Sequence, residues 1–143
     1  GASSVVYCPR THRYFGHAPH RWREMLRRGI NVAVGTDSCA SSPDLNLVDE
    51  LRLIHGLTPD VSAGQLWEMA TIRGASAIGM RDEVGSLSVG KSADMVVFAD
   101  PGPDPLRGVL DQQILPSQVW IAGRLAGPAT DDADLEARPD DAQ

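Results

Sequence analysis

A single carboxylate holds the most prominent position for chemistry in this sequence. Asp37 lies two residues after an apolar run, INVAVG (30–35), and the residues that follow it are small: Cys39, Ala40, Ser41 and Ser42. Small neighbours allow a ligand to approach closely, and a carboxylate can supply a bond to a metal ion or accept a proton from water. The alternative is structural, because Asp and Ser also cap turns and helices. Position alone leaves both interpretations open.

Histidines form a second candidate group. His12, His17 and His20 cluster in the segment after the first apolar run, at spacings of five and three residues that are not a strong helical ligand pattern. We expect His12 and His17 to contact a substrate, with surface histidines as the alternative. His55 lies near the end of an expected helix, where a positive charge is favourable, or is simply a surface group.

Arginines are concentrated between residues 10 and 28, where six of them face one acid, Glu24. Arg10 and Arg13 lie in the same segment as the histidines and can hold an anionic or carbonyl-bearing substrate by forked hydrogen bonds. Three others, Arg21, Arg27 and Arg28, are most simply the solvated face of a short helix. Cys8 and Cys39 have no evident base partner, so we expect small, buried packing residues.

The elements that position these groups are predicted from hydrophobic periodicity. The β-branched segment 3–8 and the apolar segment 30–35 are typical of strands, and a loop (10–20) and a helix (20–28) lie between them. This order and length predict a parallel βαβ unit. Two helices follow, over 45–57 and 62–80, the second ending near Gly79.

From residue 81 the pattern changes to short β runs. We predict strands over 84–89 and 94–99, a Pro-rich connection over 103–113, and a hairpin over 118–127 that turns at Ala122-Gly123. The change indicates a boundary between an α/β unit, residues 1–80, and a β-rich unit, residues 81–127. Residues 128–143 hold six acids against Arg138 and almost nothing apolar, which is typical of a disordered tail.

Composition excludes several classes of function. The net charge of the 143 residues is −6, mostly from the tail, so nucleic acid is not an expected partner. No apolar run approaches the roughly 18–20 residues of a membrane span, and two distant cysteines make no disulfide framework. We therefore expect a cytoplasmic protein that acts on a small molecule. Oligomeric state is open, and a homo-oligomer is one possibility.

Three motifs together resemble the C-terminal part of the amidohydrolase superfamily, in its chlorohydrolase and cyclic-amidine deaminase branch. They are GINVAVGTDSCASSPDLNLVDELRL, LWEMATIRGASAIGM and EVGSLSVGKSADMVVF, and the resemblance covers about residues 4–127. It implies the last two strands (5–8 and 31–35) and helices of a distorted (β/α)8 TIM-like barrel within residues 1–80. It also implies that residues 81–127 form part of a small flanking β-sandwich.

The resemblance also implies a site. Asp37 matches an aspartate that binds a divalent metal, zinc before iron, and shuttles a proton from the attacking water. We expect Thr36 and Ser38 to hold this carboxylate, and His12, His17 and Arg10 to contact substrate. Relatives often carry His-Asn-Pro-x-Ser-Asn where this sequence has YCPRTH (7–12), which puts His12 at a substrate-facing position.

The expected reaction is hydrolysis of a carbon–nitrogen bond other than a peptide bond, most simply deamination of an aminated heterocycle. The histidine ligands that the family carries on earlier strands are not in this chain, and a whole barrel needs at least about 200 residues. We therefore expect a C-terminal fragment of a longer enzyme, inactive by itself. The alternatives are a truncated remnant without catalysis, or an amide-ring hydrolase or chlorohydrolase of the same superfamily.

Overall fold

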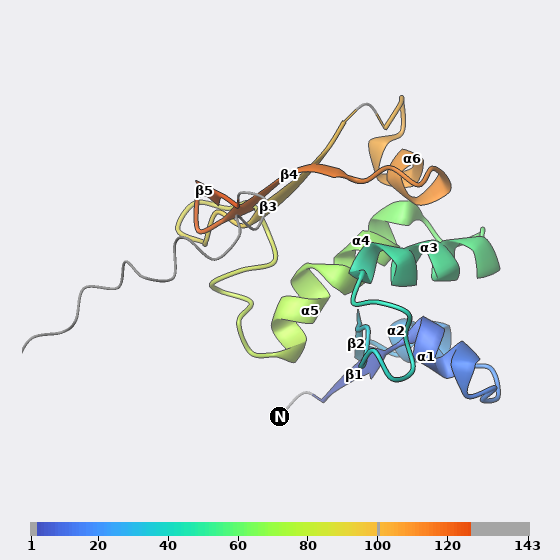
Figure 1. Ribbon diagram of the computed structural model, residues 1–143. Coiled ribbons are helices and arrows are strands. Elements are labelled where there is room, and N and C mark those ends of the chain that lie inside the picture. Colours follow the sequence, from blue (N-terminus) through green and yellow to red (C-terminus); the bar gives the residue numbers. More distant parts are fainter. Residues whose placement is uncertain (1–2, 100, 127–143) are drawn as a thin grey trace, which may run out of the picture.

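The computed structural model describes residues 3–99 and 101–126, and its first half is built on two parallel strands. β1 (Ser4–Tyr7) pairs with β2 (Asn31–Val34) from Ser4 opposite Asn31 to Tyr7 opposite Val34. Between them lie α1 (Pro9–Tyr14) and α2 (Trp22–Arg27). The predicted βαβ unit is confirmed. Because the strands are parallel, the residues that follow them lie at one edge of the sheet (Figure 1).

Three helices cover β2. They are α3 (Leu47–Leu57), α4 (Ala63–Ala70) and α5 (Ile72–Ala77); α4 and α5 pack directly on β2, and α3 packs mainly on α4. Side-chain caps begin two of them, since Asn46 accepts from Val48 N–H and Ser62 from Gln65 N–H. The apolar faces of these elements form one core, which includes Trp22, Val32, Leu51, Ile54, Leu66 and Met69.

The expected single helix over 62–80 is two helices. The helix is interrupted at Thr71, whose φ of −116° and ψ of −96° are not helical. Its hydroxyl donates to the carbonyl oxygen of Trp67 at 2.7 Å, four residues back, a contact by which threonine competes with the backbone and bends helices. The predicted end of the helix is close to the observed one, because α5 ends at Ala77 and Gly79 adopts a positive φ of 77°.

Two short helices replace segments predicted as irregular. Helix α1 occupies much of the expected loop 10–20, and α6 (Pro105–Asp111) lies inside the expected Pro-rich connection. Both carry proline in the first turn, where its missing N–H and fixed φ are compatible with a helix. Asp104 caps α6 by accepting from Arg107 N–H.

Leu110 of α6 joins the core of the first half, so the boundary expected near residue 80 does not separate two cores. The division into units over 1–80 and 81–127 stays a prediction.

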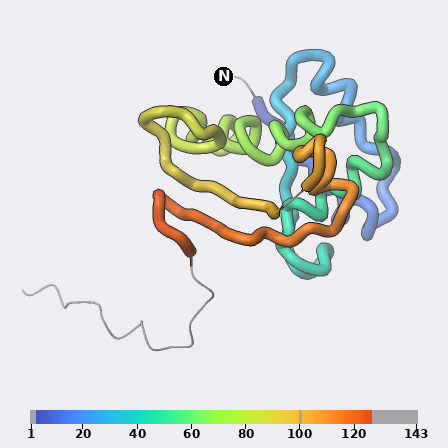
Figure 2. Tube along the Cα trace, turned by 90° about the horizontal axis from the view of Figure 1, so that it is seen from above, coloured from blue at the N-terminus to red at the C-terminus, as the bar shows by residue number. Residues whose placement is uncertain are grey.

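The second half contains an antiparallel sheet in the order β3 (Met95–Phe98), β4 (Pro116–Ile121) and β5 (Arg124–Leu125). The predicted hairpin is confirmed: Ala122 and Gly123 form its turn with φ of 49° and 76°. In Figure 2 these strands run beside one another along the margin of the helical part. The expected strand over 84–89 is wrong, because this segment is turns, with Gly85 and Gly90 at positive φ and Leu87 and Val89 exposed.

Two other sequence expectations concern the C-terminal tail and membrane-spanning segments. The predicted disordered tail, residues 128–143, lies outside the described residues. Within 3–99 and 101–126, the helices are all too short or too polar to pass through a bilayer.

The fold generates a sharp prediction at Gly108. A Cβ there would lie 1.7 Å from the carbonyl oxygen of Pro101, so helix α6 and this backbone cannot both keep their places. Gly108→Ala should lower the free energy of unfolding by about 1–3 kcal/mol, measured by urea denaturation. Gly56→Ala is the matched control: this helical glycine has open space around its Cβ, and the change should stabilise by about 0.5–1 kcal/mol. Equal stability of the two variants would contradict the packing described for α6.

Candidate functional site

Asp37 lies three residues beyond the end of β2 and is exposed. Its φ of 59° is in the left-handed region, which Asp tolerates better than most residues. Within the described residues its carboxylate makes no hydrogen bond or ion pair. The turn after it is held instead by the backbone, because Ser41 and Ser42 N–H donate to the carbonyl oxygen of Ser38 at 3.1 and 3.0 Å. The carboxylate is therefore not used as a cap.

Gly35 allows the two strands to close up just before Asp37. A Cβ on Gly35 would lie 2.8 Å from Val6 Cγ1 and 3.3 Å from Cys8 Sγ. The absence of a side chain at Gly35 thus allows the close approach of β1 to β2. Cys8 is half-buried and its thiol has a raised pKa, caused first by burial and then by the charges of Asp37 and Glu50. Cys39 is exposed, so the expectation of a buried residue there is wrong.

The hydroxyls expected to hold the Asp37 carboxylate have other partners. Thr36 Oγ1 donates to the carbonyl oxygen of Asp37 at 3.3 Å, and Ser38 Oγ accepts from Ala40 N–H at 3.4 Å. These contacts shape the backbone around Asp37 and leave its oxygens accessible. The roles predicted for Thr36 and Ser38 at the carboxylate stay predictions.

Arg10 ties α1 to the segment after Asp37. Its Nε lies 2.7 Å from Glu50 Oε1, and its Nη2 lies 2.7 Å from Asp44 Oδ1 and 3.1 Å from the carbonyl oxygen of Asn46. Burial alone would lower the pKa of Arg10, but the hydrogen bonds that it donates to the Asp44 and Glu50 carboxylates outweigh burial, and the pKa is raised. These contacts give Arg10 a structural position; its expected contact with substrate stays a prediction.

Sequence reasoning missed Glu50, although the position of this acid among apolar residues of α3 was informative. Its side chain is fully buried, at 0% exposure, and it accepts from the backbone N–H of Arg10 at 2.8 Å and from Ser42 Oγ at 3.4 Å. Glu50 lies three residues after Leu47 and four before Ile54, on the apolar stripe of α3. An acid at such a position must be paired, which points to a cation nearby.

The histidines gather around Tyr7 at the end of β1. Tyr7 is 8% exposed and stacks on His20, with ring centroids 4.5 Å apart and an interplanar angle of 9°. His12 meets both rings edge-on, at 5.6 and 5.7 Å, and lies 5.5 Å from His17. Burial, and then the charge of His12, lower the pKa of His20. The structure thus brings the three histidines together, as their loop position suggested.

The histidine cluster and Asp37 lie at the same edge of the parallel sheet. Tyr7 and Val34 are register partners; α1 begins two residues after Tyr7, and Asp37 lies three residues after Val34. A hydrogen bond of 2.9 Å between Thr11 and Ser41 joins the two segments. This edge therefore combines an accessible carboxylate with imidazole rings, a combination suited to proton transfer and to hydrogen bonding with a polar small molecule.

The residues present fit a metal ion only in part. Asp37 can provide one bond, but among residues 3–99 and 101–126 there is no group of three or more His, Cys, Asp or Glu side chains that could hold a metal. Catalytic zinc sites normally have three protein ligands. This chain, as described, supplies part of a metal site at most.

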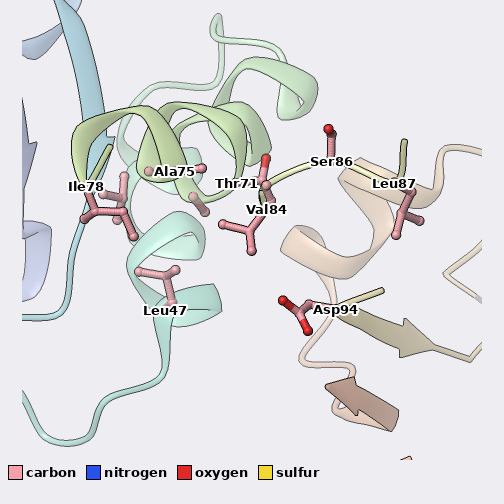
Figure 3. A pocket seen from close by; sticks show the side chains of 12 residues that line it. Leu47, Thr71, Ala75, Ile78, Val84, Ser86, Leu87 and Asp94 are labelled. Carbon is pink, nitrogen blue, oxygen red and sulfur yellow. The ribbon is translucent and has the colours of Figure 1, made fainter. Parts of the chain in front are cut away.

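Two hollows lie away from this edge of the sheet. One, of about 490 Å³, lies between α5, Leu47 and the turn that contains Val84 and Leu87, as Figure 3 shows. A second, of about 560 Å³, lies between Trp67, Phe98 and Leu106. Neither is lined by Asp37 or His12, and both are mainly apolar. They belong to the packing between the helices and the antiparallel sheet.

Comparisons with known proteins agree with the sequence motifs. The model of the amidohydrolase family matches residues 1–126. A 5-methylthioadenosine/S-adenosylhomocysteine deaminase of Teredinibacter turnerae is 33% identical over 134 residues, which cover 83% of this chain and 30% of that protein.

Solved structures give the same result. An adenosine deaminase from Xanthomonas campestris with bound zinc superposes with a TM-score of 0.71 at 34% identity, covering 85% of this chain and 31% of that one. An atrazine chlorohydrolase from Arthrobacter aurescens, complexed with zinc, gives a TM-score of 0.73 at 26% identity, covering 87% and 31%. The chain therefore spans less than a third of the length of these relatives.

The buried ion pair generates a stability prediction. Glu50→Gln removes the charge that compensates Arg10 in a buried position and should lower the free energy of unfolding by about 3 kcal/mol. Glu24→Gln is the control, because Glu24 pairs with Arg21 and Arg28 on the surface and its loss should cost at most about 1 kcal/mol. Urea denaturation of both variants measures the difference, and equal losses would show that the Glu50 contacts do not hold this edge together.

Proposed function

This chain belongs to the amidohydrolase family, and we propose on that premise that the protein hydrolyses a carbon–nitrogen bond other than a peptide bond, deaminating an aminated heterocycle. Relatives at 33% and 34% identity are named as deaminases of 5-methylthioadenosine/S-adenosylhomocysteine and of adenosine. The observation that carries the proposal is the accessible carboxylate of Asp37, which follows a parallel strand at the edge where ligands bind in α/β folds.

In the proposed mechanism Asp37 moves the proton. One carboxylate oxygen accepts a proton from the attacking water and then returns it to the departing nitrogen, so the group acts first as base and then as acid. A divalent metal, when bound, would lower the pKa of water so that hydroxide is available for attack near neutral pH. Asp37 would contribute one ligand to that metal. Zinc is preferred because both solved structures described above contain it.

The wider architecture is also part of the proposal. We assign residues 1–80 to the last two strands and helices of a (β/α)8 barrel, and residues 81–127 to strands of a flanking β-sandwich. The chain covers 30% of its deaminase relative, so the remaining ligands would come from polypeptide other than the described residues. His12 and His17 are proposed to contact a small-molecule substrate. The turn-forming hydroxyls of Thr36 and Ser38 support the backbone that presents Asp37.

Chloride release is the main alternative reaction, because one similar structure is an atrazine chlorohydrolase. Its identity to this chain, 26%, is lower than the 33% and 34% of the two deaminases, which favours deamination. A screen of aminated and chlorinated heterocycles that measures ammonia and chloride in parallel separates the two reactions. Chloride release without ammonia would reject deamination while leaving the family assignment in place.

Asp37→Asn tests the proposed proton carrier. In the longest reading frame that contains this chain, the variant should lose activity by about 10²–10⁴-fold, because an amide cannot accept and return the proton. Asparagine tolerates the left-handed backbone at this position, so unfolding free energy should change by less than about 0.5 kcal/mol. The control is Asp60→Asn, an exposed acid paired with Arg23, which should leave activity unchanged. Full activity of the Asp37 variant would remove the basis of the proposal.

The 143-residue chain should have no hydrolase activity by itself. It supplies one proposed metal ligand, whereas a catalytic zinc normally needs three from the protein. The measurement is ammonia release with and without added zinc, beside the complete reading frame at the same concentration. Zinc-dependent turnover by the 143 residues alone would contradict this expectation and the partial metal site.

A further inference from the structure

The hydrogen bonding of His12 carries an inference about how substrate is selected, which rests on the proposed function. His12 Nε2 lies 2.9 Å from the carbonyl oxygen of Ala18. A carbonyl oxygen only accepts hydrogen bonds, so Nε2 must carry a hydrogen. In the neutral ring the other nitrogen, Nδ1, is then an acceptor with a free lone pair.

The surrounding rings fix the position of this acceptor. His12 packs edge-on against Tyr7 and against His20, and these two rings are themselves stacked 4.5 Å apart. The backbone adds a second restraint, since His17 N–H donates to the carbonyl oxygen of His12 at 3.3 Å. A ring held on two sides and at Nε2 has little freedom to rotate, so Nδ1 keeps one direction.

The surroundings of His20 disfavour a positive charge on its ring. Burial holds the pKa of His20 below its usual range, and the charge of His12 lowers it further, so the two rings disfavour being charged together. No acid is paired with His12 or His20 within the described part of the chain. The cluster therefore does not offer a pair of positive charges to an anion.

We propose that His12 selects substrate as a hydrogen-bond acceptor: its Nδ1 receives a hydrogen bond from an O–H or N–H group of the heterocycle or its substituent. Tyr7 and His20 are positioning residues for this ring. The substrate class is thus an aminated heterocycle with a donor placed away from the amino group that is removed. An analogue that lacks this donor leaves Nδ1 without a partner and is disfavoured.

Two isosteric variants isolate the acceptor. Both His12→Asn and His12→Leu lose the donation to Ala18, but asparagine keeps an oxygen near the position of Nδ1 and leucine does not. In the complete reading frame, kcat/KM of the Leu variant should fall about 10- to 100-fold, mainly through KM, while the Asn variant stays within a few-fold of wild type. The unfolding midpoints of the two should be alike.

The outcomes separate this inference from the proposed function. A wild-type protein without deaminase activity overturns the proposed function, and this inference falls with it. An active wild type in which the Asn and Leu variants have equal kcat/KM overturns this inference alone. In addition, ¹⁵N NMR of the imidazoles in the 143-residue chain at pH 8 should show His12 protonated at Nε2. Protonation at Nδ1 instead would overturn the inference whatever the activity.

Discussion

The buried carboxylate of Glu50 is the constraint on which the candidate site depends. Its oxygens accept hydrogen bonds from the side chain and from the backbone N–H of Arg10, so the start of α1 is fixed to α3. Arg10 in turn holds Asp44 and the carbonyl of Asn46, in the segment that leads from Asp37 to α3. A buried charge is costly unless it is fully paired, so these partners cannot be removed singly without a large loss. The geometry at the sheet edge is thus set by one acid that does no chemistry itself.

The parallel sheet is unusually small within the described residues. β1 and β2 form a two-stranded parallel sheet, a type that normally occurs in larger sheets with both faces covered. Helices α4 and α5 cover β2, where Val32 is fully buried, whereas Val6 of β1 remains 55% exposed. The burial is therefore one-sided. This asymmetry agrees with the coverage of less than a third of the length of the relatives, since similar proteins have more polypeptide with which to cover such a surface.

Sequence patterns predicted the elements that bury apolar residues and missed those governed by local capping. β1, β2, α3 and the β4–β5 hairpin were predictable because apolar periodicity or turn residues specify them directly. The helix break at Thr71 depends on one hydroxyl that bonds to the preceding turn, which periodicity does not show. α1 and α6 were missed because proline was interpreted as a breaker rather than as a first-turn residue. At the site, Asp37 and the histidines were predictable from their position after strands, while the pairing of Arg10 with Glu50 joins residues 40 apart and required the fold.

Polar groups at this edge divide into those with partners and those without, and the division separates scaffold from chemistry. Arg10, Glu50, Thr11 and Ser41 are buried or partly buried and are bonded to one another or to the backbone. Asp37 is exposed, its backbone is in the left-handed region, and its oxygens are free within the described residues. Among the described residues Nδ1 of His12 likewise has no hydrogen-bond partner, whereas Nε2 of the same ring is bonded to the carbonyl oxygen of Ala18. Folding stability favours polar groups that are paired, so accessible groups held by a hydrogen-bonded scaffold are those available to a substrate.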